Sequence, residues 1–209
     1  MRSRTFLPWL LITVLAMAVF IPFLGAVHLF DWDEINFAEC AREMLVSKNY
    51  SIVQIGYLPF WEKPPLFIWM QAASMHFFGV NEFAARLPNA ICGVITLLSV
   101  YAIGRKVYDD RFARLWVLVF AGSILPGFYF HSGIIDPWFN LFIFLGIYQF
   151  IIYTNEFPSI STQKLFHRRI ILSAVFIALA VLTKGPVALL IFGLCFLVWR
   201  LLKRAPVMS

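Results

Sequence analysis

The chain has 209 residues, of which 61% are hydrophobic and 13% are charged, and its mean hydropathy is +0.82. This composition excludes an ordinary soluble globular domain. The net charge of +6 would also fit a nucleic-acid-binding protein, but membrane topology explains the basic residues better, so no nucleic-acid partner is expected. The sequence indicates an all-α, polytopic integral membrane protein with a single membrane domain over residues 1–209.

The first apolar run covers residues 6–27 and contains no charged residue. As a helix it would be ~33 Å long, which is enough to cross a hydrocarbon core of ~30 Å. We therefore predict that residues 6–27 form a first transmembrane helix, retained as an anchor. Later apolar runs predict five further spans, at about 87–104, 112–130, 135–153, 170–183 and 186–202.

Lysine and arginine gather in four clusters: Arg2/Arg4, Arg105/Lys106/Arg111/Arg114, Lys164/Arg168/Arg169 and Arg200/Lys203/Arg204. Because positively charged loops stay in the cytoplasm, a six-helix path with both termini inside places every cluster on that side. The same path puts three connections outside the cytoplasm: the 28–86 loop, the 131–136 turn and the 183–186 turn. We expect an inner-membrane protein whose active face is extracytoplasmic.

The 28–86 loop carries most of the chain's acidic residues and should contain two helices that do not span. Asp31 or Asp33 can cap an amphipathic helix that runs to about residue 46 and lies at the membrane interface. The apolar segment Leu66–Phe78 follows two prolines and ends at Gly79, a pattern typical of a short helix. Asn81 can cap the element that follows.

Two carboxylates near the predicted outer face are candidates for catalysis, because charge at membrane depth costs about 2.5–3.5 kcal/mol and is rarely kept without a use. Asp33 could accept a proton from an incoming hydroxyl or amine. Alternatively, Asp31 and Glu34 could form a capping box at this helix start. Asp136 lies in the turn between two apolar helices and could instead cap the second of them.

Five residues are candidates for binding a substrate: Glu34, Arg42, Lys63, Arg86 and Lys184. The basic residues among them are candidates for binding its phosphate. A lysine is a compact cation for phosphate, and a guanidinium binds phosphate with paired donors. The alternatives are structural: the lysines could reach the lipid headgroups, and the arginines could pair with acids such as Glu39 or Glu82. For a divalent metal ion the candidates are Glu62 and, more weakly, His131, whose more common role is a local hydrogen bond. No cofactor is required.

Two runs carry a resemblance to a known family: DEINFAECAREM and WEKPPLFIWMQAASMHFFGVNEFAARLPNAICG. They are similar to the amino-terminal portion of the aminoarabinose transferase and protein O-mannosyltransferase superfamily, glycosyltransferase family 39 and its relatives, which have the GT-C fold. The Asp of the turn after the third span and the LTKG turn follow in the expected order. The resemblance implies a partial GT-C fold that lacks the carboxy-terminal part.

The resemblance also implies roles for individual residues. Asp33 corresponds to the proposed catalytic base, Asp136 to a second aspartate implicated in activity, Lys63 to a contact with the lipid phosphate, and Glu62 to a metal ligand. One departure stands out, because the family motif often reads DEARYAE, whereas residues 35–37 here are Ile-Asn-Phe. The arginine of that motif is therefore absent.

The expected function is transfer of a sugar from a polyprenyl-phosphate donor to an extracytoplasmic lipid, glycan or protein, with inversion at the anomeric carbon. The expected partners are that donor, membrane lipid and the acceptor. One alternative is a truncated or split, non-catalytic membrane subunit, with a second polypeptide supplying the missing helices. A small polytopic transporter is less favoured, because its charges should lie along a crossing path rather than at one face.

Overall fold

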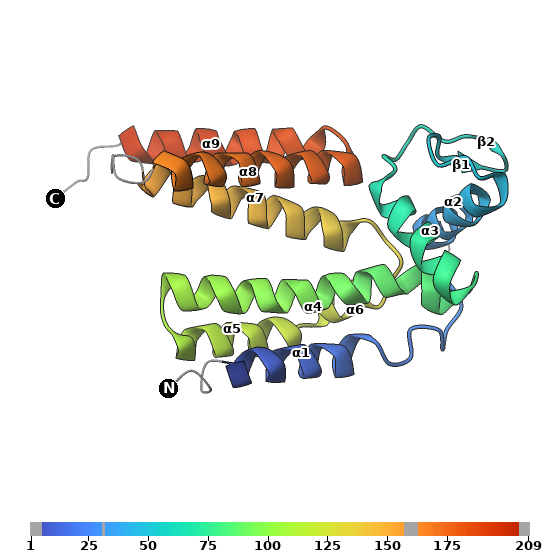
Figure 1. Cartoon of the computed structure of the whole chain (residues 1–209), viewed down its shortest axis with the longest axis horizontal. Coiled ribbons are helices and arrows are strands. Elements are labelled where there is room, and N and C mark those ends of the chain that lie inside the picture. The colour runs from blue at the N-terminus through green and yellow to red at the C-terminus, as the bar shows by residue number, and fades with distance from the viewer. Residues whose placement is uncertain (1–5, 31, 157–162, 205–209) are drawn as a thin grey trace. The chain divides into compact units, whose positions relative to one another are not determined.

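A computed structural model of the protein describes residues 6–30, 32–156 and 163–204 (Figure 1). Its elements are α1 (Phe6–Phe20), α2 (Asp33–Ser47), β1 (Gln54–Ile55), β2 (Leu58–Pro59), α3 (Leu66–Phe78), α4 (Glu82–Val107), α5 (Asp110–Ala121), α6 (Ile124–Phe130), α7 (Asp136–Glu156), α8 (Gln163–Lys184) and α9 (Val187–Arg204). The predicted all-α class is confirmed. Residues Arg2, Arg4 and Asp31, on which part of the topology and capping predictions depend, lie outside the described residues.

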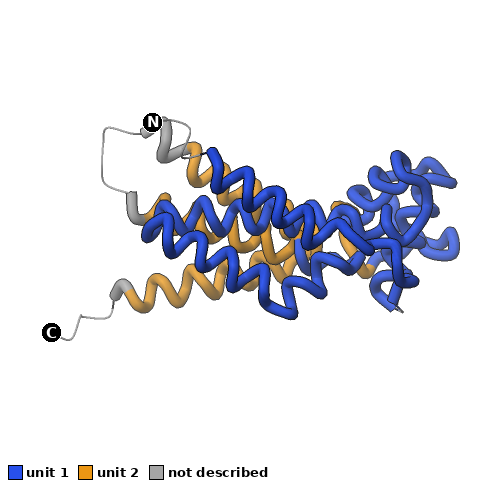
Figure 2. Tube along the Cα trace, turned by 90° about the horizontal axis from the view of Figure 1, so that it is seen from below, with its two compact units in different colours: residues 1–61, 67–137 blue, residues 62–66, 138–209 orange. Residues whose placement is uncertain are grey.

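The chain divides into two compact units, which Figure 2 shows in different colours. The first unit comprises Met1–Trp61 and Phe67–Pro137, and the second comprises Glu62–Leu66 and Trp138–Ser209. The single membrane domain expected from the sequence stays a prediction.

Helix α4 is the centre of the first unit and packs against α1, α5 and α6. Two of its glycines allow this close packing. A Cβ on Gly93 would lie 2.7 Å from an atom of the Phe20 ring and 2.9 Å from one of the Phe130 ring, and a Cβ on Gly104 would lie 3.0 Å from the Cα of Ala113. Small residues at such crossings let apolar helices approach closely, as in membrane proteins.

The prediction of one continuous helix over residues 6–27 is wrong, because α1 ends at Phe20. Pro22 explains the break: it has no backbone N–H to donate, and it disfavours the helical conformation of the residue before it. Phe23 then adopts a φ of 65°, which cannot continue a right-handed helix. Residues 21–27 form turns in place of the predicted helical end.

The two helices predicted in the 28–86 loop are present. Helix α2 begins at Asp33 and buries an apolar face that includes Phe37, Cys40 and Met44. Trp32 is its N-cap residue and gives no side-chain cap, so the predicted cap by the Asp33 side chain is absent. Helix α3 has the predicted bounds, and Gly79 follows it with a φ of 80°. Between the two helices lies an unpredicted hairpin, in which β1 and β2 pair antiparallel.

Asn81 joins α3 to α4 as predicted, and its side chain makes both of the contacts that a cap between two helices needs. Its Oδ1 accepts a hydrogen bond of 2.8 Å from the backbone N–H of Ala84, and its Nδ2 donates one of 2.8 Å to the carbonyl of Phe78. The first contact satisfies an amide in the first turn of α4.

The second unit contains most of α7 together with α8 and α9. Helices α8 and α9 form a hairpin at Gly185, whose φ is +82°. Helix α8 packs on α7 where Gly146 leaves room for Ile177, and the Ser173 hydroxyl donates to the carbonyl of Gly146.

Two of the described helices are long and apolar enough to cross a membrane, namely Glu82–Val107 and Asp136–Thr154. The pair α5 and α6 adds a third if it forms one span with a bend of 69°. The total of about six spans, the membrane orientation and the interfacial position of α2 and α3 stay predictions.

Candidate functional site

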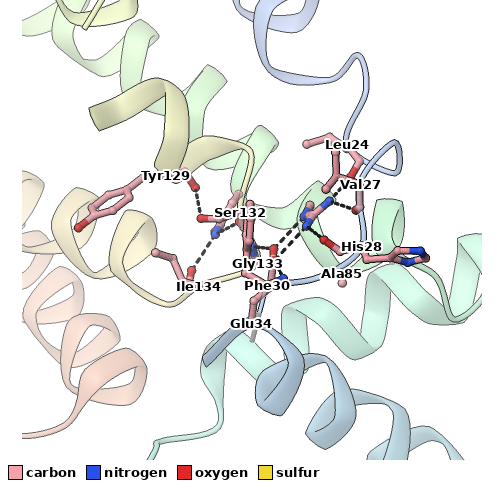
Figure 3. A network of polar contacts seen from close by, with 12 residues as sticks. Leu24, Val27, His28, Phe30, Glu34, Ala85, Tyr129, Ser132, Gly133 and Ile134 are labelled. Atoms are coloured by element: carbon pink, nitrogen blue, oxygen red, sulfur yellow. Dashed lines mark hydrogen bonds and ion pairs between the residues drawn. The ribbon is translucent and has the colours of Figure 1, made fainter. Parts of the chain in front are cut away.

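A buried ion pair between Glu34 and Arg86 lies at the end of the first unit that carries α2 and α3 (Figure 3). The Arg86 guanidinium donates from Nε to Glu34 Oε1 at 2.8 Å and from Nη2 to Glu34 Oε2 at 3.0 Å. Both side chains are almost completely buried, at 3% and 2% exposure. A bidentate pair of this kind has fixed geometry, and its charges are compensated only as long as both partners are present.

The same guanidinium organises the loop that leads from α1 to α2. Arg86 also donates to the backbone carbonyls of Leu24, Val27 and His28, over 2.7–2.9 Å. Glu34 in turn accepts a hydrogen bond of 2.7 Å from the backbone N–H of Phe30. The pair thus fixes residues 24–30 against α4 and against the start of α2.

Three buried side chains bind the backbone of the turn 132–134. Glu34 Oε1 accepts from the N–H of Gly133, and Gln71 Nε2 donates to the Gly133 carbonyl at 3.4 Å. Asn89 Nδ2 donates to the carbonyls of Ser132 and Ile134 at 2.6 and 2.7 Å. The glycine makes this fit close, because a Cβ at position 133 would lie 3.2 Å from atoms of both Gln71 and Glu34.

These contacts connect the segments that carry the two candidate catalytic carboxylates. Asp33 immediately precedes Glu34 at the start of α2, and Asp136 follows the turn 132–134 as the first residue of α7. Both aspartates are half-buried. The structure therefore ties the backbone of the Asp136 turn to the residue next to Asp33. That the two carboxylates share one pocket stays a prediction.

The two candidate arginines both form ion pairs with carboxylates. Arg42 makes two hydrogen bonds to Glu39, at 2.6 and 2.8 Å. This is the ion pair given above as the structural alternative to a phosphate contact. The hydrogen bonds from Arg42 hold the pKa of the Glu39 carboxyl below its ordinary value. Arg86 also pairs with an acid, but its partner is Glu34 rather than Glu39 or Glu82. A phosphate contact by Arg86 would require breaking that buried pair.

In the second unit, the two candidate lysines belong to neighbouring turns. Lys63 is followed by Pro64, and a Cβ on Gly185, the residue after Lys184, would lie 3.9 Å from the Pro64 ring. The Lys184 ammonium lies 5.6 Å from the centroid of the Phe139 ring, within the range of a cation–π contact. Both lysines are half-buried, whereas Glu62 is exposed.

The metal candidates receive no support from clustering. In the part of the chain that the structure describes, no three His, Cys, Asp or Glu side chains are grouped so that they could hold a metal ion. His131 makes the local hydrogen bond expected as its commoner role, with 2.7 Å between Nδ1 and the carbonyl of Gly127.

Sequence reasoning missed three residues that shape this region: Gln71, Asn89 and Gly133. The first two are single amides in otherwise apolar helix segments, and a buried amide needs hydrogen-bond partners. An amide in an apolar segment therefore indicates a buried polar contact. It does not indicate that the partner of Asn89 is a turn more than forty positions away.

The fold is α-helical and contains candidate membrane spans. The description of the family whose model matches residues 62–208 reads dolichyl-phosphate-mannose-protein mannosyltransferase. This match covers most of the chain, and the chain belongs to that family. The resemblance noted in the sequence is confirmed.

Curated relatives are named as arabinosyl transferases. The chain is 31% identical to undecaprenyl phosphate-alpha-4-amino-4-deoxy-L-arabinose arabinosyl transferase 1 of Proteus mirabilis, over 91% of this chain and 34% of the relative. It is 29% identical to the corresponding transferase of Shewanella sediminis, over 85% of this chain and 32% of the relative. The chain thus spans about a third of the length of these relatives.

Two solved structures share the fold. The crystal structure of ArnT from Cupriavidus metallidurans in the apo state matches with a TM-score of 0.83 and 22% identity, over 98% of this chain and 37% of that one. The structure of the same protein bound to undecaprenyl phosphate matches with a TM-score of 0.78 and 24% identity, over 93% and 36% of the two chains. At these identities the likeness establishes the fold alone.

Proposed function

We propose that this chain takes part in the transfer of a sugar from a polyprenyl-phosphate donor to an acceptor outside the cytoplasm. The observation that carries the proposal is its membership of a family described as mannosyltransferases that use a lipid-phosphate sugar. The relatives' names, which specify an undecaprenyl-phosphate aminoarabinose donor, support the same donor class. The apolar helices and the alternating basic clusters support a location in the inner membrane with both termini in the cytoplasm.

In the proposed reaction, a hydroxyl or amine of the acceptor attacks the anomeric carbon of the sugar as the bond from that carbon to the phosphate oxygen breaks. The bonding electrons leave with the polyprenyl phosphate, and the acceptor's proton passes to the Asp33 carboxylate. Attack opposite to the leaving group inverts the anomeric centre. A carboxylate in this role typically contributes a factor of about 10²–10⁴ to the rate.

The remaining candidates act on the charges around this centre. Lys63 and Lys184 stabilise the phosphate, where negative charge grows in the transition state. Asp136 acts as a second carboxylate of the site. We assign the Glu34–Arg86 pair to holding the loop and the helix start, because both side chains are buried and bonded to each other. No step is routed through a metal ion, since the described residues show no clustered ligand set.

The decisive experiment places Asp33→Asn at the chromosomal locus of the source organism and supplies its membranes with polyprenyl phosphate carrying radiolabelled 4-amino-4-deoxy-arabinose or mannose. Wild-type membranes should transfer the label to an endogenous acceptor, and the variant should lose about 10²–10⁴-fold in rate. Asp110→Asn is the matched control, because Asp110 contacts Tyr101, Arg105 and Arg114 and is not a candidate for the site. Transfer that is unchanged in Asp33→Asn would refute the assignment of the base, and solute flux without transfer would favour a transporter.

A further inference from the structure

We propose that Glu34, Gln71 and Asn89 form a polar clamp that positions the turn 132–134, and that this clamp sets the rate of the chemical step by fixing Asp136. The three residues are positioning residues, since they bind the backbone before Asp136; Glu34, a substrate-binding candidate in the sequence, is buried and paired with Arg86. The inference rests on the proposed function.

The polar clamp reaches the turn from three helices at once. Glu34 comes from α2, Gln71 from α3 and Asn89 from α4, and together they bind the Gly133 N–H and the carbonyls of residues 132, 133 and 134. Figure 3 shows Glu34 beside Ser132, Gly133 and Ile134, which form the short segment between α6 and α7. A turn held through four backbone groups from three directions has little freedom to shift relative to any one of the helices.

Close contact adds to the hydrogen bonds. Because a Cβ at Gly133 would approach atoms of Gln71 and Glu34 to 3.2 Å, the backbone of the turn lies directly against both side chains. The last contact of the clamp, at the Ile134 carbonyl, is two residues before Asp136. A displacement of the turn therefore passes directly into the start of α7.

The energetics of the two amides favour a geometric role over a stabilising one. Gln71 and Asn89 are both 0% exposed, and in the described part of the chain Gln71 Oε1 and Asn89 Oδ1 have no hydrogen-bond partner. A buried polar atom without a partner is costly, and an apolar side chain of similar shape would avoid that cost. What an apolar side chain could not supply is the direction in which the turn is held.

The test uses the protein purified from source-organism membranes and two variants, Asn89→Leu and Gln71→Met, which remove the amide donors and keep most of the side-chain bulk. Each has a matched control on its own helix. Thr96→Val removes a buried hydroxyl of α4 that lies 3.9 Å from the Cys92 sulfur. Ser74→Ala removes a buried α3 hydroxyl that has no partner among the described residues. Variant folding is checked by the elution profile and by the amount recovered.

The first measurement is hydrogen exchange of the backbone amides in a peptide covering residues 131–137. We expect exchange to accelerate about tenfold or more in Asn89→Leu and Gln71→Met, with unchanged exchange in the interior of α4. The controls should match the wild type. Unchanged exchange at the turn in both amide variants would overturn the clamp, whatever their activity.

The second measurement is transfer activity per folded protein, separated into kcat and KM for the donor lipid. Because a misplacement of about 1 Å can cost 10²-fold in rate, we expect kcat to fall about 10–100-fold at nearly constant KM. If the clamp acts through Asp136, then Asn89→Leu should cause little further loss in an Asp136→Asn background.

The outcomes separate this inference from the function on which it rests. Absence of transfer by the wild-type protein would refute the proposed function. Faster exchange at the turn with unchanged kcat would refute the catalytic role of the clamp alone. Full additivity of Asn89→Leu and Asp136→Asn would do the same, because it would show that the two residues act independently.

Discussion

Replacing Arg86 by methionine is the most severe single test of the first unit. The change would leave the Glu34 carboxylate, which is 2% exposed, without its cation. It would also remove the donors to the carbonyls of Leu24, Val27 and His28. Breaking a buried pair by removing one partner typically costs about 3–5 kcal/mol. For a chain of this size that corresponds to a fall in Tm on the order of 10 °C.

The assay is thermal unfolding of the detergent-solubilised protein, with Arg105→Met as the control on the same helix. Arg105 lies 3.5 Å from Asp110, and the two side chains are 34% and 41% exposed. A pair in that environment contributes about 0–1 kcal/mol. The two variants remove the same chemical group from α4, so the difference between them reports the buried pair together with the carbonyl contacts that Arg86 makes.

A double variant tests whether the cost arises from the unpaired charge. Replacing Glu34 by leucine together with Arg86→Met removes both charges, and the combined loss should be clearly smaller than the sum of the two single losses. If Arg86→Met lowers Tm no more than Arg105→Met, or if the double variant is fully additive, the buried pair does not hold the loop to α4 and the reasoning is refuted.

Three further predictions concern packing, capping and thiol reactivity. Gly93→Ala should cost about 1–3 kcal/mol in a Tm measurement, because its Cβ would overlap two phenyl rings, whereas Gly127→Ala, with open space at its Cβ, should not destabilise the protein. Asn81→Ala should cost about 0.5–2 kcal/mol by loss of its cap to α4, and Asn81→Asp, which keeps the acceptor oxygen, should cost less. Burial raises the pKa of the Cys40 thiol to about 12, so Cys40 should resist maleimide in the folded protein and react only after unfolding. The assay uses a Cys195→Ser background, because Cys195 is exposed. Ser47→Cys, at the exposed end of the same helix, should react readily, and fast labelling of Cys40 in the folded state would contradict its burial.

Proline and glycine at helix boundaries explain which elements could be predicted from the sequence. The bounds of α3 were predictable because two prolines precede it and a glycine in the left-handed region ends it. The end of α1 was not, because counting apolar residues over 6–27 ignores what Pro22 does to the backbone. The length of the apolar run indicates a membrane protein, but the backbone restrictions at Pro22 determine where α1 ends.

At the candidate site, an ion pair within one helix could be predicted from the sequence, whereas an ion pair between distant segments could not. The pair between Glu39 and Arg42 lies within one helical turn, so its spacing indicates contact directly. The pair between Glu34 and Arg86 joins positions 52 apart, and only the tertiary fold brings the start of α2 and the start of α4 together. Chain proximity pointed to the wrong partner for Arg86, since Glu82 instead lies 3.1 Å from His28.

The adjacent acids Asp33 and Glu34 begin the same helix but differ in burial. Neighbouring residues on a helix point about 100° apart, so burial of one side chain turns the next away from the same contact. Glu34 is directed into the unit, where it binds Arg86, Phe30 and Gly133, and Asp33 remains half-buried. The buried glutamate therefore fixes the backbone from which the aspartate extends, and it does so through the same contact that holds the turn before Asp136. In the proposed reaction, the Asp33 carboxylate would therefore owe its position to its neighbour in sequence.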